Sequence, residues 1–330
     1  MISVSLLIFD EVVPSSVMGV LDMLHGVNRY LARNHKPPAF AIEAVGAQKV
    51  NFVLAAPFQL VCHKTYADIT RPDLIIVPSF NVGDPMVLSR NLDSVQWIKE
   101  MHAAGAEVAS LCAGSYFLAE AGLLDGKDVT SHWAVMDDMR KRYPSIRVKS
   151  DLVITDQEGI YTSGGAFSSL KLVLYLIEKF CGREVALWVS KMYAIELDRS
   201  SQAHFAVFAG QRQHEDREIL EAQQHIEQHY QEELTMESIA AKVHMGKRNF
   251  IRRFKAATNN TPFEYLQRVR IESAKKAIEQ NDKDLSSIID DTGYHDLKTF
   301  RTIFKRITGL TPQEYRKKYA RNREPGVAIL

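Results

Sequence analysis

The 330-residue sequence has little cysteine and no long hydrophobic run. Its three cysteines, Cys62, Cys112 and Cys181, are far apart and show no CxxC spacing, which argues against a disulfide framework and a zinc or redox pair. This usage fits a reducing compartment, so we expect a cytoplasmic protein. No stretch approaches the roughly 20 apolar residues of a membrane span, and the start, MISVSLLIFDE, lacks the basic region of a signal peptide. We expect no membrane partner, no metal and no cofactor.

The sequence also has little excess charge of either sign, with a formal net charge of +1 at pH 7. That charge is unevenly divided, because residues 217–330 hold 21 Lys and Arg against 16 Asp and Glu, a balance of +5, and the remainder is at −4. Opposite signs suggest a basic module that faces a polyanion and an acidic module with another task. The length and the 46% apolar content fit two independently folding domains.

The first 182 residues alternate apolar runs with amphipathic stretches. The runs ISVSLLIF, FAIEAVGA, DLIIVPSF and AEVASL have the pattern of strands, and helical patterns cover residues 16–30, 92–104 and 134–143. The short strand KDVTSH, a hairpin-like pair around VKSDLVITDQEGIYTSGG and a long helix from Ala166 complete the series. This alternation predicts a parallel α/β sheet with helices on both faces.

Beyond Glu218 the segments have helical patterns, among them MESIAAKV, KRNFIRRFKAAT and LKTFRTIFKRIT, which predicts an all-α C-terminal domain. The preceding stretch, DRSSQAHFAVFAGQRQHEDRE, has no clean periodicity, and we place the connection between the domains there. The predicted boundaries are residues 1–195 for the first domain, 196–216 for the linker, 217–322 for the second domain and 323–330 for a tail.

An internal repeat dominates the C-terminal domain. FIRRFKAATNNTPFEY at residues 250–265 and FRTIFKRITGLTPQEY at 300–315 are offset by 50 positions and share Phe, Lys, Thr, Pro, Glu and Tyr at matching sites. Each copy follows a short helix, SIAAKV or SIIDDT, and a tight turn, HMGK or GYHD, in which Gly293 suits a positive φ. Helix, tight turn and helix form the DNA-reading motif, so the sequence predicts two such units.

The second helix of each unit has a basic outward face. Its paired Phe residues at i and i+4 are expected to face the core, which leaves the basic positions outside. A solvated surface is the alternative for one such helix, but the duplication with matching turns favours DNA. Arg248 and Arg252 share a face and could read guanine, and Asn249 could read adenine. Lys255, Lys305 and Arg306 lie later on the helices and suit phosphates. The predicted DNA-binding residues are Lys247, Arg248, Asn249, Arg252, Arg253, Lys298, Thr299, Arg301, Thr302 and Lys305.

Over residues 217–319 this domain resembles the AraC/XylS family of bacterial regulators, on the motifs SIAAKVHMGKRNFIRRFK and TGYHDLKTFRTIFKRITGLTPQEYR. The resemblance implies a long linking helix at about residues 262–280, which sets the two units on adjacent major-groove segments. Ile289 replaces the family's usual small Ala, and Asp290 and Asp291 add negative charge near the second turn. We therefore expect the first unit to dominate base reading.

In the first domain, AEVASLCAGSYF places Cys112 between an apolar strand and a helix, the design of a nucleophile elbow. The helix dipole there would favour a thiolate, and His132 of TSHW could approach it from the next strand. Over residues 1–182 the chain resembles the PfpI/ThiJ superfamily, related to class I glutamine amidotransferases, which implies a flavodoxin-like α/β sandwich. Ser16 stands where the family's enzymes have Glu, so we expect no enzyme. The predicted ligand-binding residues are Ser16, Cys112, Ala113 and His132, with Cys112 and His132 as vestiges of a catalytic pair.

The two domains together resemble the GlxA-type regulators within the AraC/XylS family. That resemblance implies a sequence-specific transcription regulator, an activator, with double-stranded promoter DNA and RNA polymerase as partners. It implies a homodimer and a small effector near Cys112, such as an amino acid, a quaternary amine or another nitrogenous metabolite. The alternative is a cysteine-dependent hydrolase or hydratase of the PfpI type that its basic domain tethers to DNA.

Overall fold

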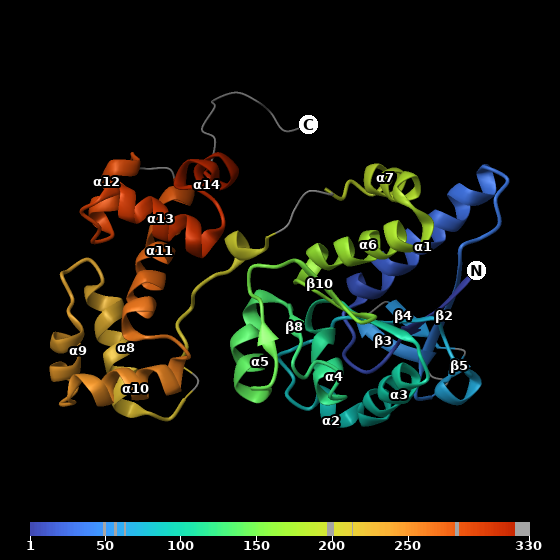
Figure 1. Ribbon diagram of the computed structural model, residues 1–330, viewed down its shortest axis with the longest axis horizontal. Coiled ribbons are helices and arrows are strands. Elements are labelled where there is room, and N and C mark those ends of the chain that lie inside the picture. The colour runs from blue at the N-terminus through green and yellow to red at the C-terminus, as the bar shows by residue number, and fades with distance from the viewer. Residues whose placement is uncertain are drawn as a thin grey trace. The chain divides into compact units, whose positions relative to one another are not determined.

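The computed structural model describes residues 1–48, 51–55, 58–62, 64–196, 201–212, 214–280 and 284–320. The chain forms two compact units, residues 1–202 and 203–330 (Figure 1). The boundary between Gln202 and Ala203 lies inside the segment predicted as the linker. The first unit is α/β and the second is all-helical, as the sequence predicts. Among the described residues, no helix has both the length and the apolarity needed to span a bilayer.

A seven-stranded sheet forms the centre of the first unit, with the order β10-β11-β7-β6-β1-β2-β5. All neighbouring strands run parallel except β10 and β11, which form the predicted hairpin. Its strands are β1 Ile2–Leu7, β2 Phe40–Gly46, β5 Lys64–Thr65, β6 Leu74–Val77, β7 Glu107–Ser110, β10 Ile154–Gln157 and β11 Ile160–Ser163.

Two small sheets stand apart from the central one. Strands β3 Asn51–Ala55 and β4 Phe58–Val61 pair antiparallel. Strand β8 Asp128–Val129, the predicted KDVTSH strand, pairs with β9 Arg147–Val148 outside the central sheet. The sequence predicts a strand at residues 128–129. It does not predict the partner strand, which begins at residue 147 after a helix has intervened.

Helices cover both faces of the central sheet, as predicted (Figure 1). On one side lie α1 Pro14–Arg33, α6 Leu170–Cys181 and α7 Arg183–Met192, and on the other α2 Val87–Arg90, α3 Leu92–Ala103, α4 Ser115–Glu120 and α5 Met136–Arg142. Every side chain of β6 is buried, as expected for a parallel strand enclosed on both faces. Pro14 begins α1, where its missing N–H is no loss.

The second unit has two small cores joined by one long helix. Helices α8, α9, α10 and the start of α11 enclose the first core, and the end of α11 with α12, α13 and α14 encloses the second. The predicted linking helix is confirmed as α11. The helices are α8 Arg217–His229, α9 Met236–Lys242, α10 Lys247–Thr258, α11 Pro262–Gln280, α12 Leu285–Asp291, α13 Leu297–Thr308 and α14 Pro312–Tyr319.

The residues shared by the two repeats build the framework of these cores. Phe250, Phe254 and Tyr265 form an aromatic chain with ring centroids 5.6 and 5.3 Å apart, and in the other core Phe300, Phe304 and Tyr315 repeat it at 5.5 Å per step. These six side chains are buried, and a buried Phe contributes about 1.5–3 kcal/mol. The repeated TPxE segments are capping boxes, with Thr261 and Glu264 before α11 and Thr311 and Glu314 before α14.

Candidate functional site

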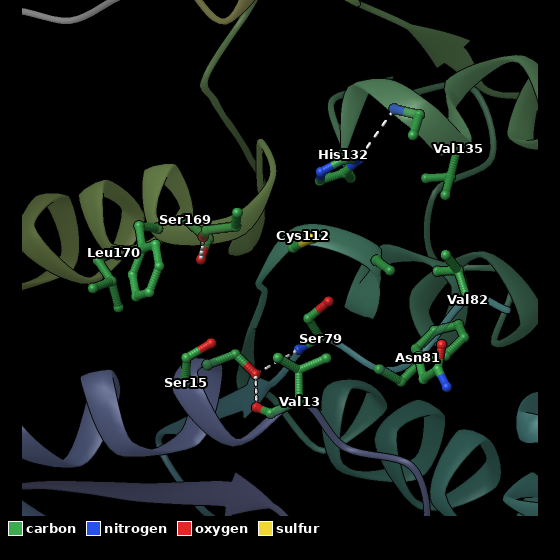
Figure 2. A pocket seen from close by; sticks show the side chains of 16 residues that line it. Val13, Ser15, Ser79, Asn81, Val82, Cys112, His132, Val135, Ser169 and Leu170 are labelled. Atoms are coloured by element: carbon green, nitrogen blue, oxygen red, sulfur yellow. Dashed lines mark hydrogen bonds between the residues drawn. The ribbon is translucent and has the colours of Figure 1, made fainter. Parts of the chain in front are cut away.

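A cavity of about 400 Å³ opens in the first unit beyond the carboxyl ends of β6 and β7, where parallel α/β sheets bind ligands (Figure 2). Five segments supply its wall: the start of α1, the loop after β6, the turn after β7, the segment after β8 and the start of α6. The lining residues are Val13, Ser15, Ser16, Ser79, Phe80, Asn81, Val82, Cys112, Ala113, His132, Ala134, Val135, Ala166, Phe167, Ser169 and Leu170. All four predicted ligand-binding residues are among them.

Cys112 lies in the sharp turn predicted after its strand. Its φ is 55°, a left-handed conformation that is strained for any residue but glycine. The turn is held by Ser115 and Ser131, whose hydroxyls donate to the Cys112 carbonyl at 3.2 and 3.0 Å. A side chain at Gly114 would approach the Val77 carbonyl to 2.5 Å, so the Cys-Ala-Gly sequence permits close contact between the turn and β6. The thiol is thereby fixed in the cavity wall.

His132 stands in the same wall (Figure 2). Its Nδ1 accepts a hydrogen bond from the Ala134 backbone N–H at 3.1 Å, which leaves the proton of the neutral ring on Nε2. Burial lowers the pKa of His132 below its usual 6.5 and so favours this neutral form. The ring packs directly on the backbone of Gly165, where an added Cβ would lie 1.9 Å from Cδ2.

Ser16 connects two edges of the cavity. Its hydroxyl donates to the Val13 carbonyl at 2.7 Å and accepts from the Ser79 N–H at 3.1 Å. The residue is only 6% exposed. Ser16 therefore holds the loop after β6 against the start of α1.

Several wall residues were missed in the sequence. Ser79, Phe80, Asn81 and Val82 follow the apolar run DLIIV, and polar or aromatic residues just after a parallel strand are a signal that could have identified them. Phe167 lies in the short helical segment Ala166–Ser169 before α6 and is 74% exposed. Its contribution depends on packing that periodicity does not show.

Gln202, also missed, ties the end of the first unit to the back of the cavity wall. Its side chain is buried and donates to the carbonyls of Ser131 and Leu152 at 3.0 and 2.9 Å, and it accepts from the Gly165 N–H at 3.3 Å. Ser131 precedes His132, which packs on Gly165. Gln202 therefore braces the position of His132 from behind.

The residues that follow are fastened to the linking helix of the second unit. Lys275 of α11 donates to the Ala206 carbonyl at 2.6 Å, and the Phe208 N–H donates to Glu272 at 3.2 Å. Glu272 and Lys275 form an ion pair at 2.8 Å with side chains 11% and 5% exposed. A buried pair that holds backbone groups on both sides fixes the segment in place.

The helices α10 and α13 each present one exposed basic face. On α10, Lys247, Arg248, Asn249, Arg252 and Lys255 are exposed. Within the described residues Arg248 makes no hydrogen bond or ion pair, Arg252 donates to Asn249 at 2.8 Å, and Lys247 pairs with Glu237. The face is therefore cationic and open to a large anionic partner.

Arg253 differs from its neighbours. Its guanidinium donates to Asp216 at 2.6 and 2.9 Å and to Glu218 at 2.9 Å, and its side chain is 29% exposed. The Asp216 hydrogen bonds raise the pKa of Arg253, and those from Arg253 lower the pKa of Asp216. Arg253 thus fastens α10 to the start of α8, although the sequence groups it with the DNA-binding residues.

The matching face on α13 is less positive. Lys298, Thr299, Arg301, Thr302 and Lys305 are exposed. Two hydroxyls already have partners, because Thr299 donates to Asp296 at 2.5 Å and Thr302 donates to the Lys298 carbonyl at 2.9 Å. The N-cap of α13 is Asp296, whereas α10 has the uncharged Gly246. The N-terminus of α13 therefore carries a carboxylate that α10 lacks.

The turns between the paired helices differ by one residue. Residues 243–246 separate α9 from α10, and residues 292–296 separate α12 from α13. The second turn is thus one residue longer than the predicted GYHD turn, because it also includes Thr292. Gly293 takes the positive φ predicted for it, 75°, and His244 takes 53° at the equivalent place.

Comparison with known proteins matches each unit to a family. Residues 3–179 match the DJ-1/PfpI family, and residues 239–318 match a helix-turn-helix domain. The chain is 27% identical over 223 residues to the HTH-type transcriptional regulator CdhR of Pseudomonas aeruginosa, covering 67% of this chain and 66% of that protein. Alignments with the first curated relatives span 61–66% of those proteins, less than two thirds of their length.

Two further similarities concern the first unit. The chain is 29% identical over 186 residues to an isonitrile hydratase of Pseudomonas putida, covering 56% of this chain and 75% of the hydratase. The crystal structure of an AraC family transcriptional regulator from Pseudomonas putida superposes with a TM-score of 0.51 at 18% identity, covering 58% of this chain and 100% of that chain. The latter similarity shows a common fold.

Proposed function

We propose that this chain, which belongs to the DJ-1/PfpI family and carries a C-terminal helix-turn-helix domain of the AraC type, is a sequence-specific DNA-binding transcription regulator. The strongest support is the pair of exposed basic helices, α10 and α13. They lie at equivalent places in the two helix-turn-helix motifs that α11 joins. The relatives of this architecture are HTH-type regulators.

In this proposal α10 and α13 enter neighbouring major-groove segments. Arg248 and Arg252 contact base edges, since an exposed guanidinium can take guanine O6 and N7 together. The later lysines, Lys255 and Lys305, contact phosphates, which adds affinity without sequence preference. Asn249, Lys298 and Arg301 complete the reading faces, with Lys247, Thr299 and Thr302 in supporting positions. The first helix-turn-helix, α9 and α10, reads more of the sequence because its exposed face is more positive than that of α13.

The test is a quantitative gel shift with the full chain on a site obtained by selection from random duplexes. Arg252→Ala is expected to cost about 1–3 kcal/mol and to relax preference at one base pair. Lys305→Ala weakens all sequences alike and lowers the salt dependence by about one phosphate contact. If Arg252→Ala weakened binding to all DNA sequences equally, Arg252 would not be a base-reading residue.

The first unit, in our proposal, is the effector-binding and dimerising part. A cavity whose wall is drawn from five segments suits a small molecule, and Ser16, Cys112, Ala113 and His132 form part of it. The regulator would act in the cytoplasm as a homodimer and as an activator that contacts RNA polymerase. Thermal-shift screening of metabolites checks the sensor role, because a ligand that binds the folded state raises Tm.

Gln202 is proposed to link the cavity to the DNA-binding unit. It is the last residue fixed to the first unit, and the next residues are fastened to α11, the helix between the two reading helices. A ligand that shifts His132 or Gly165 would therefore shift Gln202 and the chain that follows. Such coupling is reciprocal, so DNA would alter ligand affinity by the same factor.

A second candidate function is a cysteine-dependent hydratase or hydrolase held on DNA. The strained turn at Cys112 and the similarity to an isonitrile hydratase favour it. Ser16 argues against this candidate, because it offers no carboxylate at the cavity. If the chain is a regulator without catalytic activity, Cys112 and His132 serve as ligand contacts. Full regulation by a Cys112→Ala variant, with no turnover of isonitriles or amides by the parent, would eliminate this candidate.

A further inference from the structure

The wall of the cavity contains no formally charged side chain among the 16 residues that line it in the described part of the chain. His132, the one titratable base in the wall, is kept neutral by burial, which lowers its pKa. Charged groups before the start of α1 and in the loop after β6 are already engaged. Glu11 accepts from Asn81 at 3.2 Å, and Arg90 pairs with Asp10 at 3.0 Å and with Asp84 at 2.6 Å.

A charged ligand would therefore lose part of its hydration without gaining a counter-ion from the described wall residues. The effective penalty for burying an unpaired ion is several kcal/mol. Two phenyl rings in the wall could attract a cation, but one ring contributes roughly 0.5–2 kcal/mol, less than that penalty. Phe80 is moreover packed edge-on against Tyr116 and Phe117, at 6.0 and 5.7 Å between centroids, which limits access to its ring. Amino acids and quaternary amines fit this wall poorly.

Polar atoms left available in the wall can donate hydrogen bonds. The hydroxyls of Ser16 and Ser169 donate to the carbonyls of Val13 and Ala166 at 2.7 and 2.6 Å. The hydroxyl of Ser79, by contrast, has no partner among the described residues although Ser79 is only 6% exposed. Figure 2 shows it pointing into the cavity.

Two further features of the wall also present a partial positive charge to the cavity. His132 carries its proton on Nε2, because Nδ1 accepts from Ala134. The 20-residue helix α1 begins at the cavity, where Ser15 and Ser16 stand in its first turn, so its positive dipole end faces the space. Each of these features can donate a hydrogen bond to, or attract, an electron-rich oxygen.

We infer that the cavity binds an uncharged small molecule with an apolar body and a carbonyl oxygen. The oxygen accepts hydrogen bonds from Ser79 and His132, and the apolar body packs against Val13, Phe167 and Leu170. Among the described residues of the wall there is no Lys or Arg to neutralise a full negative charge, so a carboxylate binds more weakly than an amide. The inference rests on the proposed function only in treating this molecule as the effector.

The experiment compares three probes of equal length on the full chain by calorimetry or ligand-observed NMR at pH 7.5. The probes are hexanamide, hexanoate and hexylammonium. We expect hexanamide to bind at least about tenfold more tightly than either ion, since tenfold corresponds to 1.4 kcal/mol and the ionic penalty is larger. Equal or tighter binding of hexylammonium, or no binding of hexanamide, would overturn the inference.

Substitutions in the cavity wall test whether hexanamide binds there. Ser79→Ala should weaken hexanamide binding roughly 2- to 10-fold, the range for one net hydrogen bond. Ser89→Ala, an exposed serine on α2 outside the cavity, is the matched control and should change nothing. His132→Asn provides a second test should Ser79→Ala fold poorly. Unchanged amide affinity in both wall variants would place the amide elsewhere and contradict the inference.

Gel shifts on the same preparations keep this inference separate from the proposed function. A chain that prefers specific DNA but binds hexylammonium refutes the ligand class alone. A chain that binds hexanamide as expected but shows no DNA sequence preference refutes the regulator alone.

Discussion

At the scale of the residue, each turn between paired helices depends on one left-handed backbone position. Gly293 has φ 75°, and an added Cβ would lie 2.7 Å from the Gln231 carbonyl oxygen and 2.9 Å from that of Tyr230. Gly293→Ala should therefore lower the free energy of unfolding of the helical unit by about 2–4 kcal/mol, from the left-handed strain and the backbone clash together. Chemical denaturation followed by circular dichroism measures this loss.

Gly126→Ala is the matched control. Gly126 also has a positive φ, 69°, but no atom lies within 4 Å of its added Cβ. Its free energy of unfolding should fall only by the cost of the left-handed backbone conformation, about 1–2 kcal/mol. Equal losses in the two variants would show that the contact with the end of α8 does not matter.

His132 should titrate below its usual pKa of 6.5. Between its folded and unfolded pKa values, His132 binds more protons in the unfolded state. Its contribution to the free energy of unfolding is therefore fully present above about pH 6.5 and is lost as the pH drops through the folded pKa. Protonation would also place a proton on Nδ1 and break the bond from Ala134. NMR titration of the ring measures the pKa, and a value at or above 6.5 would contradict the assignment.

Single-residue roles divide into those the sequence reveals and those it does not. Positive φ at Gly293 could be predicted because glycine alone adopts it freely. The ion pairs of Arg253 with Asp216 and Glu218 could not be predicted, because they join residues more than 30 positions apart. The unpartnered hydroxyl of Ser79 likewise depends on which neighbours the loop after β6 contacts.

At the scale of the element, adjacent residues on α10 should behave differently. Arg252 is exposed and Arg253 is held by Asp216 and Glu218. Arg252→Ala should weaken specific DNA binding with little change in Tm. Arg253→Ala should lower Tm and affect specific and random DNA alike, because it detaches α8 from α10. Gel shifts and thermal unfolding on both variants test this, and identical profiles would contradict the separation.

The order and type of the main elements followed from the sequence because periodicity reports which face is buried. The sheet with helices on both faces, the hairpin of β10 and β11, and α11 were all predicted. The pairing of β8 with β9 and the longer second turn were not, since both depend on contacts distant in the chain. The repeat predicts two DNA-binding motifs, but the residues identical in its two copies are mostly helix caps and core aromatics.

Across the whole molecule, coupling between the cavity and the DNA-binding unit depends on Gln202. Gln202→Ala should raise hydrogen exchange at the Gly165 amide, which loses its acceptor, and also at the Phe208 amide, which is bonded to Glu272 beyond the boundary. Gln96→Ala, an exposed glutamine on α3, is the control and should alter neither. Faster exchange at Gly165 alone would show that Gln202 braces the cavity without transmitting its state.

Footprinting of the full chain on a selected site at physiological salt measures directly whether α10 and α13 read DNA sequence. We expect protection of two adjacent major-groove segments about one helical turn apart, with binding at least about 10³-fold tighter than to random duplex. Arg252→Ala should lose contacts in one segment and leave the other protected. Uniform protection without sequence preference would contradict the reading of DNA sequence by α10 and α13.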